Sequence, residues 1–278
     1  MRFTKMEGIG NDYVYVNGFA ERVDDPAALS VRMSRAHYGC GSDGLILILP
    51  GERAPFRMRM FNSDGSESGM CGNGIRCMAR YCYDRGLTSQ TDFDIETGGG
   101  LKHVWLCLEN GEVTGVRVDM GAPELDGLLL PSTLAGAPVV GYPLEHEGTA
   151  YPVTLVNMGN PHAVLFVDDP ERAPVEHVGP ALERAPVFPE RCNIEFVHVD
   201  SRARARMRVW ERGTGETMAC GTGACAAHVA GVLNGLLDRA SVIELRGGQL
   251  RIEWREDDGH VYMTGPATFV YDGEWLQG

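Results

Sequence analysis

The sequence has little lysine and an excess of acidic side chains. Its only lysines are Lys5 and Lys102, and 38 acidic against 25 basic residues give a formal net charge of −13. A pyridoxal phosphate enzyme needs a lysine for its Schiff base, and neither lysine lies in a glycine-rich phosphate loop. Nucleic-acid binding needs clustered Lys and Arg. The composition therefore argues against pyridoxal phosphate and against a nucleic-acid partner.

Long apolar runs are also missing. No stretch approaches the roughly 18 apolar residues that a membrane helix needs, and residues 1–7 lack the apolar block of a secretory signal. We therefore expect no membrane partner and a cytoplasmic location.

The eight cysteines form no Cys-x-x-Cys pair, and their spacings do not match the usual structural zinc patterns. Cytoplasmic proteins keep their thiols reduced, so we expect neither disulfides nor a bound metal. The sequence also lacks the Gly-Lys-Ser/Thr of a nucleotide-binding loop. We therefore expect catalysis, if any, to need no cofactor.

Two halves of the chain repeat one pattern. Asn160 follows Asn11 by 149 positions, and Cys220 follows Cys71 by the same 149 positions. At this offset residues 57–61 align with 206–210, and residues 98–102 align with 247–251. An offset shared by several motifs indicates an internal duplication.

The repeated pattern predicts matching elements in the two halves. β-Rich or alternating runs predict strands, and runs of small and apolar residues after each cysteine predict helices. The paired predictions are strands at 12–16 and 162–167, at 44–49 and 193–199, and at 57–61 and 206–210, with helices at 75–82 and 224–233. Unpaired predictions are a helix near 26–38, a strand within 139–152, and strands at 100–108, 113–120, 242–245, 250–256 and 261–264.

These elements predict the fold class. The helix at 224–233 is apolar on all sides, so we expect it to be buried under curled strands. We therefore expect an α+β fold of two pseudo-symmetric domains, each a curled, mostly antiparallel β-sheet or barrel around a central α-helix. The expected domains are residues 1–121 and 122–265, with residues 266–278 packing back onto the first.

The two cysteine turns carry the chemistry. Cys71 and Cys220 each stand before Gly-x-Gly and a helix, where free amides and the helix dipole favour anions. A substrate carboxylate could bind the amides of four residues: Gly72, Asn73, Gly221 and Thr222. The same field lowers a cysteine pKa from about 8.5 toward roughly 3.5 to 7.5. Either sulfur would then be a base near neutral pH.

The duplication gives this chemistry a stereochemical purpose. Two facing thiols could remove a proton from one side of a carbon and deliver one from the other, which inverts the centre. The sequence therefore predicts a racemase or epimerase. The other cysteines lack this setting and are expected to be packing residues: Cys40, Cys77, Cys82, Cys107, Cys192 and Cys225.

Five motifs follow in order along nearly the whole chain: residues 8–12 (GIGND), 61–66 (FNSDGS), 70–77 (MCGNGIRC), 159–162 (GNPH) and 211–217 (ERGTGET) running into 219–223 (ACGTG). With these motifs the sequence resembles the diaminopimelate epimerase family. Its members are cofactor-independent isomerases that interconvert LL- and meso-diaminopimelate in bacterial lysine and peptidoglycan precursor synthesis. The resemblance implies the same activity, and a homodimer.

The resemblance also implies roles for individual residues. It makes Cys71 and Cys220 the paired acid and base, with His162 and Glu211 supporting catalysis. It places substrate contacts at Asn11, Asn62, Asn160, Asn193, Glu211 and Arg212, beside the four turn residues named above. The sequence departs from some relatives at Gly44, where they carry a substrate-contacting glutamine. The resemblance does not assign the resting thiolate to either cysteine.

Other interpretations stay open from the residues alone. Asn11 and Asn160 could be turn residues, Glu211 and Arg212 a solvated ion pair, and His162 a satisfied histidine beside a strand. Proline racemase and hydroxyproline epimerase share the two-thiol chemistry, but relatives of that type carry His where this chain has Asn73. A thiol redox sensor or a metal-binding module would also use cysteines of low pKa.

Overall fold

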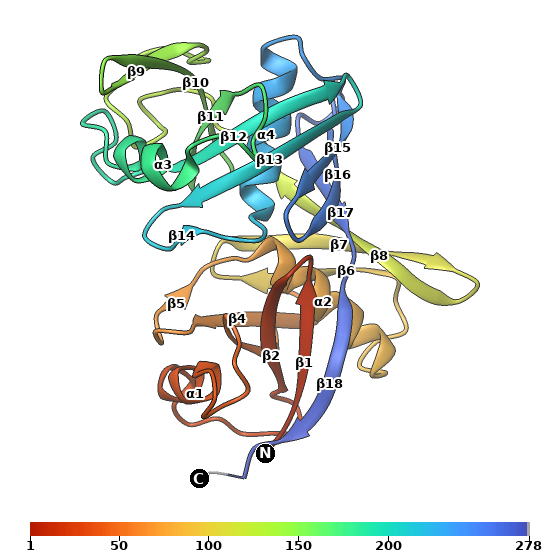
Figure 1. Cartoon of the computed structure of the whole chain (residues 1–278). Helices are drawn as coiled ribbons and strands as arrows, with labels where there is room; N and C mark the ends of the chain where they lie inside the picture. The colour runs from red at the N-terminus through yellow and green to blue at the C-terminus, as the bar shows by residue number, and fades with distance from the viewer. Residues whose placement is uncertain (277–278) are drawn as a thin grey trace. The chain divides into compact units, whose positions relative to one another are not determined.

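The computed structural model describes residues 1–276 and divides into two compact units (Figure 1). Met1–Asp119 and the segment that starts at Thr264 form unit 1, and Met120–Met263 forms unit 2. The chain leaves unit 1 within strand β8 (Glu112–Gly121) and leaves unit 2 within strand β17 (Val261–Gly265). Residues 266–278 are expected to pack back onto the first half. The last two of them, residues 277–278, lie outside the described residues.

Unit 1 combines two helices with a curled set of strands. Its other elements are β1 (Arg2–Gly8), β2 (Asn11–Asn17), α1 (Pro26–Ser34), β3 (Gly44–Pro50), β4 (Phe56–Asn62), β5 (Glu67–Ser68), α2 (Gly72–Asp84), β6 (Asp92–Thr97), β7 (Gly100–Glu109) and β18 (Thr268–Glu274). β18 pairs antiparallel with β1, and the buried Arg76 of α2 donates from Nε to the carbonyl of Pro266 at 3.1 Å. The C-terminal segment is therefore part of unit 1.

Unit 2 repeats this arrangement. Its other elements are β9 (Tyr142–His146), β10 (Thr149–Asn157), β11 (Pro161–Phe166), α3 (Val175–Glu183), β12 (Asn193–Ser201), β13 (Arg204–Glu211), β14 (Gly215–Glu216), α4 (Gly221–Leu233), β15 (Ala240–Leu245) and β16 (Gly248–Trp254). The predicted strand within 139–152 corresponds to β9 and the start of β10. Helix α3 was not predicted.

The register of the strands repeats with the sequence. In unit 1, β2 runs parallel to β3 with Tyr13 opposite Gly44, and β3 is antiparallel to β4. In unit 2, β11 runs parallel to β12 with His162 opposite Asn193, and β12 is antiparallel to β13. His162 and Asn193 each lie 149 positions after their unit 1 counterparts. The duplication therefore extends to the hydrogen-bonding pattern.

A buried helix lies at the centre of each unit. α2 contacts β1, β2 and β7, and α4 contacts β10 to β13 together with β15 and β16 (Figure 1). Small residues allow this packing: a Cβ on Gly231 of α4 would lie 2.5 Å from a Leu237 side-chain atom. The predicted α+β fold of strand-wrapped helices is confirmed.

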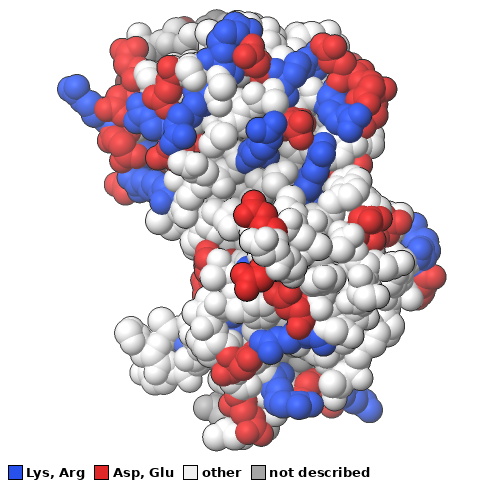
Figure 2. Space-filling view, turned by 90° about the vertical axis from the view of Figure 1, so that its right-hand side faces the viewer, with Lys and Arg blue, Asp and Glu red and all other residues white. Residues whose placement is uncertain are grey.

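The surface is mixed in charge, and acidic and basic side chains are interspersed over the face in Figure 2. Within residues 1–276, no helix has the length and apolarity needed to cross a membrane.

Candidate active site

Each predicted cysteine is the N-cap of its central helix. α2 begins at Gly72 directly after Cys71, and α4 begins at Gly221 directly after Cys220. Both cysteines have extended backbone, with φ, ψ of −137°, 118° for Cys71 and −122°, 109° for Cys220. Each Sγ accepts the amide of the residue three positions later at 3.3 Å. The helices begin three residues before the predicted starts because the glycine turns form their first turn.

The second glycine of each turn is required by close packing. A Cβ on Gly74 would lie 2.6 Å from Cδ1 of Ile46, and a Cβ on Gly223 would lie 2.9 Å from Oε1 of Glu195. A side chain at either position would force Ile46 or Glu195 to move. These glycines let the helix starts approach the neighbouring strand.

In unit 1 an asparagine contacts the cysteine turn. Oδ1 of Asn11 lies 3.5 Å from Sγ of Cys71, within reach of a thiol proton, and accepts Nδ2 of Asn73 at 3.3 Å. Nδ2 of Asn11 donates to Oδ2 of Asp43 at 2.6 Å. Burial raises the pKa of the Asp43 carboxyl above its ordinary value, although hydrogen bonds oppose the shift. Asn11 is therefore oriented by Asp43, with its carbonyl toward the turn.

The remaining unit 1 residues lie at the same sheet edge. Asn62 ends β4, opposite Gly44 at the start of β3, and Asn11 starts the neighbouring β2. Nδ2 of Asn62 donates to Oγ of Ser66 at 2.9 Å. At Gly44 a Cβ would lie 2.1 Å from the carbonyl oxygen of Phe61. The backbone therefore has no room for the glutamine that some relatives carry there.

Unit 2 places the equivalent residues at the equivalent edge. Asn160 precedes β11, Asn193 starts β12 and Glu211 ends β13. Nδ2 of Asn193 donates to the Pro161 carbonyl at 2.8 Å, and its Oδ1 accepts the Arg212 amide at 2.8 Å. Asn193 thus ties two chain segments together at this edge.

The side chains next to Asn193 point to other partners. Arg212 donates from Nη1 to the carbonyl of Glu190 at 3.1 Å. Oε1 of Glu211 accepts the hydroxyl of Thr217.

A buried histidine and a buried carboxylate support this edge. Nδ1 of His162 lies 2.6 Å from Oε1 of Glu195, and neither side chain is exposed to solvent. Nε2 of His162 lies 3.0 Å from Oδ1 of Asn160, which accepts and so fixes a proton on Nε2. Burial raises the pKa of Glu195 despite the opposing influence of His162.

The environment of the Cys220 thiol raises its pKa. Burial raises its pKa well above the ordinary value, and the charges of Glu211 and Glu195 raise it further. The Thr222 hydroxyl, 3.4 Å from Sγ, and the Gly223 amide oppose this shift. The predicted lowering of the cysteine pKa is therefore wrong for Cys220, because burial and two carboxylates outweigh the helix terminus.

Glu195 was missed by the sequence analysis. A charged residue inside the apolar run of residues 193–199 was the available signal, because a buried carboxylate requires a partner. Alternation along a strand also places residue 195 on the same face as residue 193. The partner, His162, lies 33 positions away and is brought opposite by the parallel pairing of β11 and β12.

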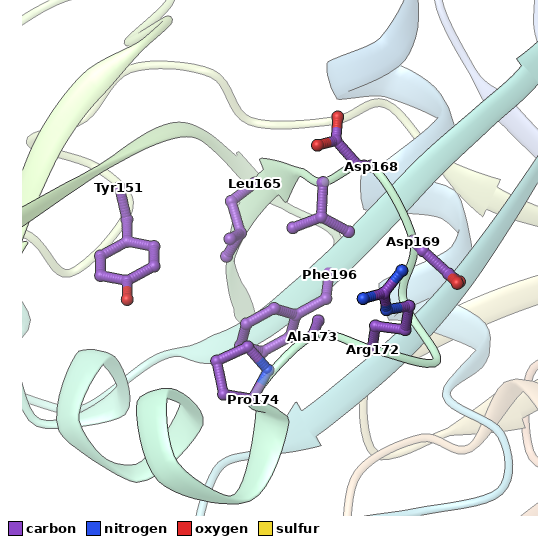
Figure 3. A pocket seen from close by; sticks show the side chains of 9 residues that line it. Tyr151, Leu165, Asp168, Asp169, Arg172, Ala173, Pro174 and Phe196 are labelled. Carbon is purple, nitrogen blue, oxygen red and sulfur yellow. The ribbon is translucent and has the colours of Figure 1, made fainter.

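A separate cavity of about 440 Å³ lies in unit 2 (Figure 3). Tyr151, Leu165 and Phe196 contribute apolar surface, and Asp168, Asp169 and Arg172 contribute charge. It contains none of the predicted site residues, so the cavity is distinct from the cysteine turns.

Comparison with known proteins decides the family. The family model "Diaminopimelate epimerase" matches residues 3–125 and 154–270. The chain belongs to the diaminopimelate epimerase family. The diaminopimelate epimerase of Acetivibrio thermocellus is 52% identical over 274 residues, covering 99% of this chain and 98% of that protein. The diaminopimelate epimerase of Moorella thermoacetica is 53% identical over 276 residues, covering 99% of each.

Solved structures share the fold at much lower identity. A PhzF-family phenazine biosynthesis protein from Bacillus anthracis matches with a TM-score of 0.71 at 18% identity, over 100% of this chain and 99% of that chain. A hydroxyproline epimerase from Agrobacterium vitis matches with a TM-score of 0.70 at 14% identity, over 98% and 90%. These likenesses support the fold alone, whereas the sequence relatives place the chain among the diaminopimelate epimerases.

Proposed function

We propose that this chain epimerises LL-2,6-diaminopimelate to meso-2,6-diaminopimelate by two-base proton transfer between Cys71 and Cys220. The observation that carries the proposal is the pair of cysteine N-caps, which present a sulfur at the start of each central helix with the same geometry. Membership of the diaminopimelate epimerase family supplies the substrate class.

The helix starts bind the reacting carboxylate in this proposal. The intrahelical ladder begins with Ile75 donating to the Cys71 carbonyl and Ala224 donating to the Cys220 carbonyl. Of the three amides before each donor, those of Gly74 and Gly223 bond the cysteine sulfurs. The helical hydrogen bonds do not use the other four, which belong to Gly72, Asn73, Gly221 and Thr222. Amides that hold the carboxylate also stabilise the negative charge that moves onto its oxygens as the α-carbon loses its hydrogen, which makes that hydrogen more acidic.

The proposal assigns the base to Cys71 and the acid to Cys220. The Cys71 sulfur, as a thiolate, takes the α-hydrogen, so an S–H bond forms as the C–H bond breaks. The Cys220 thiol, which burial keeps protonated, delivers its proton to the opposite face and becomes the thiolate. The next turnover in the reverse direction exchanges the roles. A substrate ammonium paired with Glu211 offsets the charge that raises the Cys220 pKa, and so makes this thiol a better acid.

The polar sheet edges recognise the rest of the substrate. Diaminopimelate carries a second ammonium and a second carboxylate, and Asn11, Asn62, Asn160, Asn193 and Arg212 offer amide and guanidinium groups for them. Gly44 makes no such contact. His162 holds Asn160 through its Nε2, and Glu195 acts as a positioning residue for His162.

Deuterium incorporation tests this function. In deuterium oxide, LL-diaminopimelate should yield meso product with deuterium at the inverted centre, whereas L-proline and trans-4-hydroxyproline should exchange nothing. Deuterium entering only a proline-type substrate would contradict the proposal. Cys71→Ser should abolish turnover, with Cys77→Ala as the control because Cys77 is buried within α2. A Cys71→Ser protein with full turnover that lost only its response to oxidants would favour a redox sensor.

We also infer a cytoplasmic homodimer. Reduced thiols suit the cytoplasm, and the cysteines are free. The dimer rests on the resemblance to the family. Light scattering of the purified chain at micromolar concentration tests it, and a monomer mass would contradict it.

A further inference from the structure

A cluster of two histidines and a glutamate lies in unit 2. It comprises His146 at the end of β9, Glu147 in the turn after it and His177 in α3. One potential ligand atom from each residue lies within 4.8 Å of the other two. Strand β9 packs against α3, so the cluster joins a hairpin to a helix (Figure 1). Neither the proposed reaction nor the cavity of Figure 3 uses these residues.

The hairpin holds two of the three side chains in place. His146 pairs with Thr149 across a two-residue turn, and both turn residues have positive φ, 50° at Glu147 and 75° at Gly148. Such a tight turn fixes the direction of the flanking strands. Nε2 of His177 and Oε2 of Glu147 form a hydrogen bond of 3.1 Å. This contact already brings two potential ligand atoms close to the roughly 3.3 Å that separates ligands of a tetrahedral ion with bonds of about 2.0 Å.

The third side chain supplies an independent observation. Nε2 of His146 is buried and has no hydrogen-bond partner among the described residues. The His146 and His177 rings are 5.4 Å apart between centroids. An imidazole nitrogen buried without a partner is costly, and a metal ion would satisfy its lone pair.

We propose that His146, Glu147 and His177 bind a divalent transition-metal ion of the zinc type, which fastens the β9–β10 hairpin to α3. Two imidazoles and one carboxylate suit Zn²⁺ or Ni²⁺, whereas Mg²⁺ and Ca²⁺ prefer oxygen ligands. Solvent completes the coordination, because Glu147 and His177 are exposed. The ion stabilises the folded chain by binding to it and not to the unfolded chain.

Metal titration of the full chain, first treated with a chelator, tests this site. We expect one tightly bound Zn²⁺ per chain, and affinity at least about tenfold lower in His146→Ala and in His177→Ala. His103→Ala is the matched control, since His103 lies 2.7 Å from Asp94 in unit 1 and its loss should leave the affinity unchanged. Zn²⁺ should raise the melting temperature of the wild type and of His103→Ala by a few degrees. It should not raise that of His146→Ala or His177→Ala.

Thiols are the competing ligands, and Co²⁺ distinguishes them. A thiolate-bound Co²⁺ ion gives an intense near-ultraviolet charge-transfer band, which the proposed site would not give. Metal bound with that band, or with wild-type affinity in both histidine variants, would overturn the proposal, as would no binding at micromolar metal. Glu147→Gln replaces an exposed side chain and should weaken binding without affecting the fold. Metal-free variants should retain wild-type melting temperature and epimerase activity.

Discussion

Replacing Glu195 by glutamine tests how the buried pair controls the Cys220 thiol. A Cβ on Gly223 would lie 2.9 Å from Oε1 of Glu195 and 3.2 Å from Sγ of Cys220. The carboxylate and the sulfur are therefore no more than about 6 Å apart, and at an effective dielectric constant of about 20 their charges interact by about 2.8 kcal/mol. Removing the Glu195 charge should therefore lower the Cys220 pKa.

His162 reduces the effect. Its Nδ1 is 2.6 Å from the carboxylate, and this contact weakens the effect of the carboxylate on the sulfur, so we expect Glu195→Gln to lower the Cys220 pKa by less than the full Coulomb energy. Because Cys220 delivers its proton in the proposed mechanism, the alkaline limb of the kcat profile should move to lower pH. Glu195→Gln also removes the carboxylate that orients His162. We therefore expect kcat to fall by about tenfold to hundredfold, with a smaller change in KM.

The assay is kcat and KM for LL-diaminopimelate across neutral and alkaline pH. Glu183→Gln is the control, since Glu183 is also buried but bonds Nε1 of Trp210 at 2.9 Å and the Gly213 amide at 3.1 Å. An alkaline limb that stays at the wild-type pH in Glu195→Gln, with kcat no lower than in the control, would refute the reasoning and leave Glu195 a structural residue.

Three further outcomes are expected. Cys220→Ser should lose at least about a hundredfold in kcat while its circular dichroism melt matches wild type, because serine is a good N-cap; a melt lowered by many degrees would contradict this. Arg208 lowers the pKa of the Glu216 carboxyl below its ordinary value through bonds of 2.7 and 2.8 Å. The resulting stability is present above the ordinary glutamate pKa and lost as pH falls through the lowered value, so Glu216→Gln should cost about 1–3 kcal/mol at pH 7 and less at pH 3 in urea unfolding. Gly44→Gln should lower the free energy of unfolding by about 1–3 kcal/mol, because its Cβ would meet the Phe61 carbonyl oxygen; unchanged unfolding would show that β4 can shift.

The sequence was most informative where signals were local. The constant offset identified the duplication, and the position of each cysteine before Gly-x-Gly and a small-residue run located the helix starts. Helix α3 was missed because its start has no side-chain cap, Pro174 stands at the N-cap and Pro180 lies inside the helix. Local rules disfavour a helix there, but packing against β12 and β13 forms it.

The electrostatics of the turns depended on distant residues. The helix terminus alone predicted a lowered pKa for Cys220. The opposite direction comes from burial together with Glu211, which lies 9 positions before the sulfur, and Glu195, which lies 25 before it. Their approach depends on the register of β12 and β13, which no local pattern specifies.

The cysteine caps link proton affinity to helix stability. In α2 and α4 the cysteine sulfur accepts an amide of the first turn, at 3.3 Å in both helices. A thiolate accepts that bond more strongly than a thiol does, so each proton transfer of the proposed mechanism tightens one helix start and loosens the other. A substitution that strengthens either cap will also make its sulfur a weaker base. Thermostable variants of this enzyme must therefore gain their stability away from these two turns.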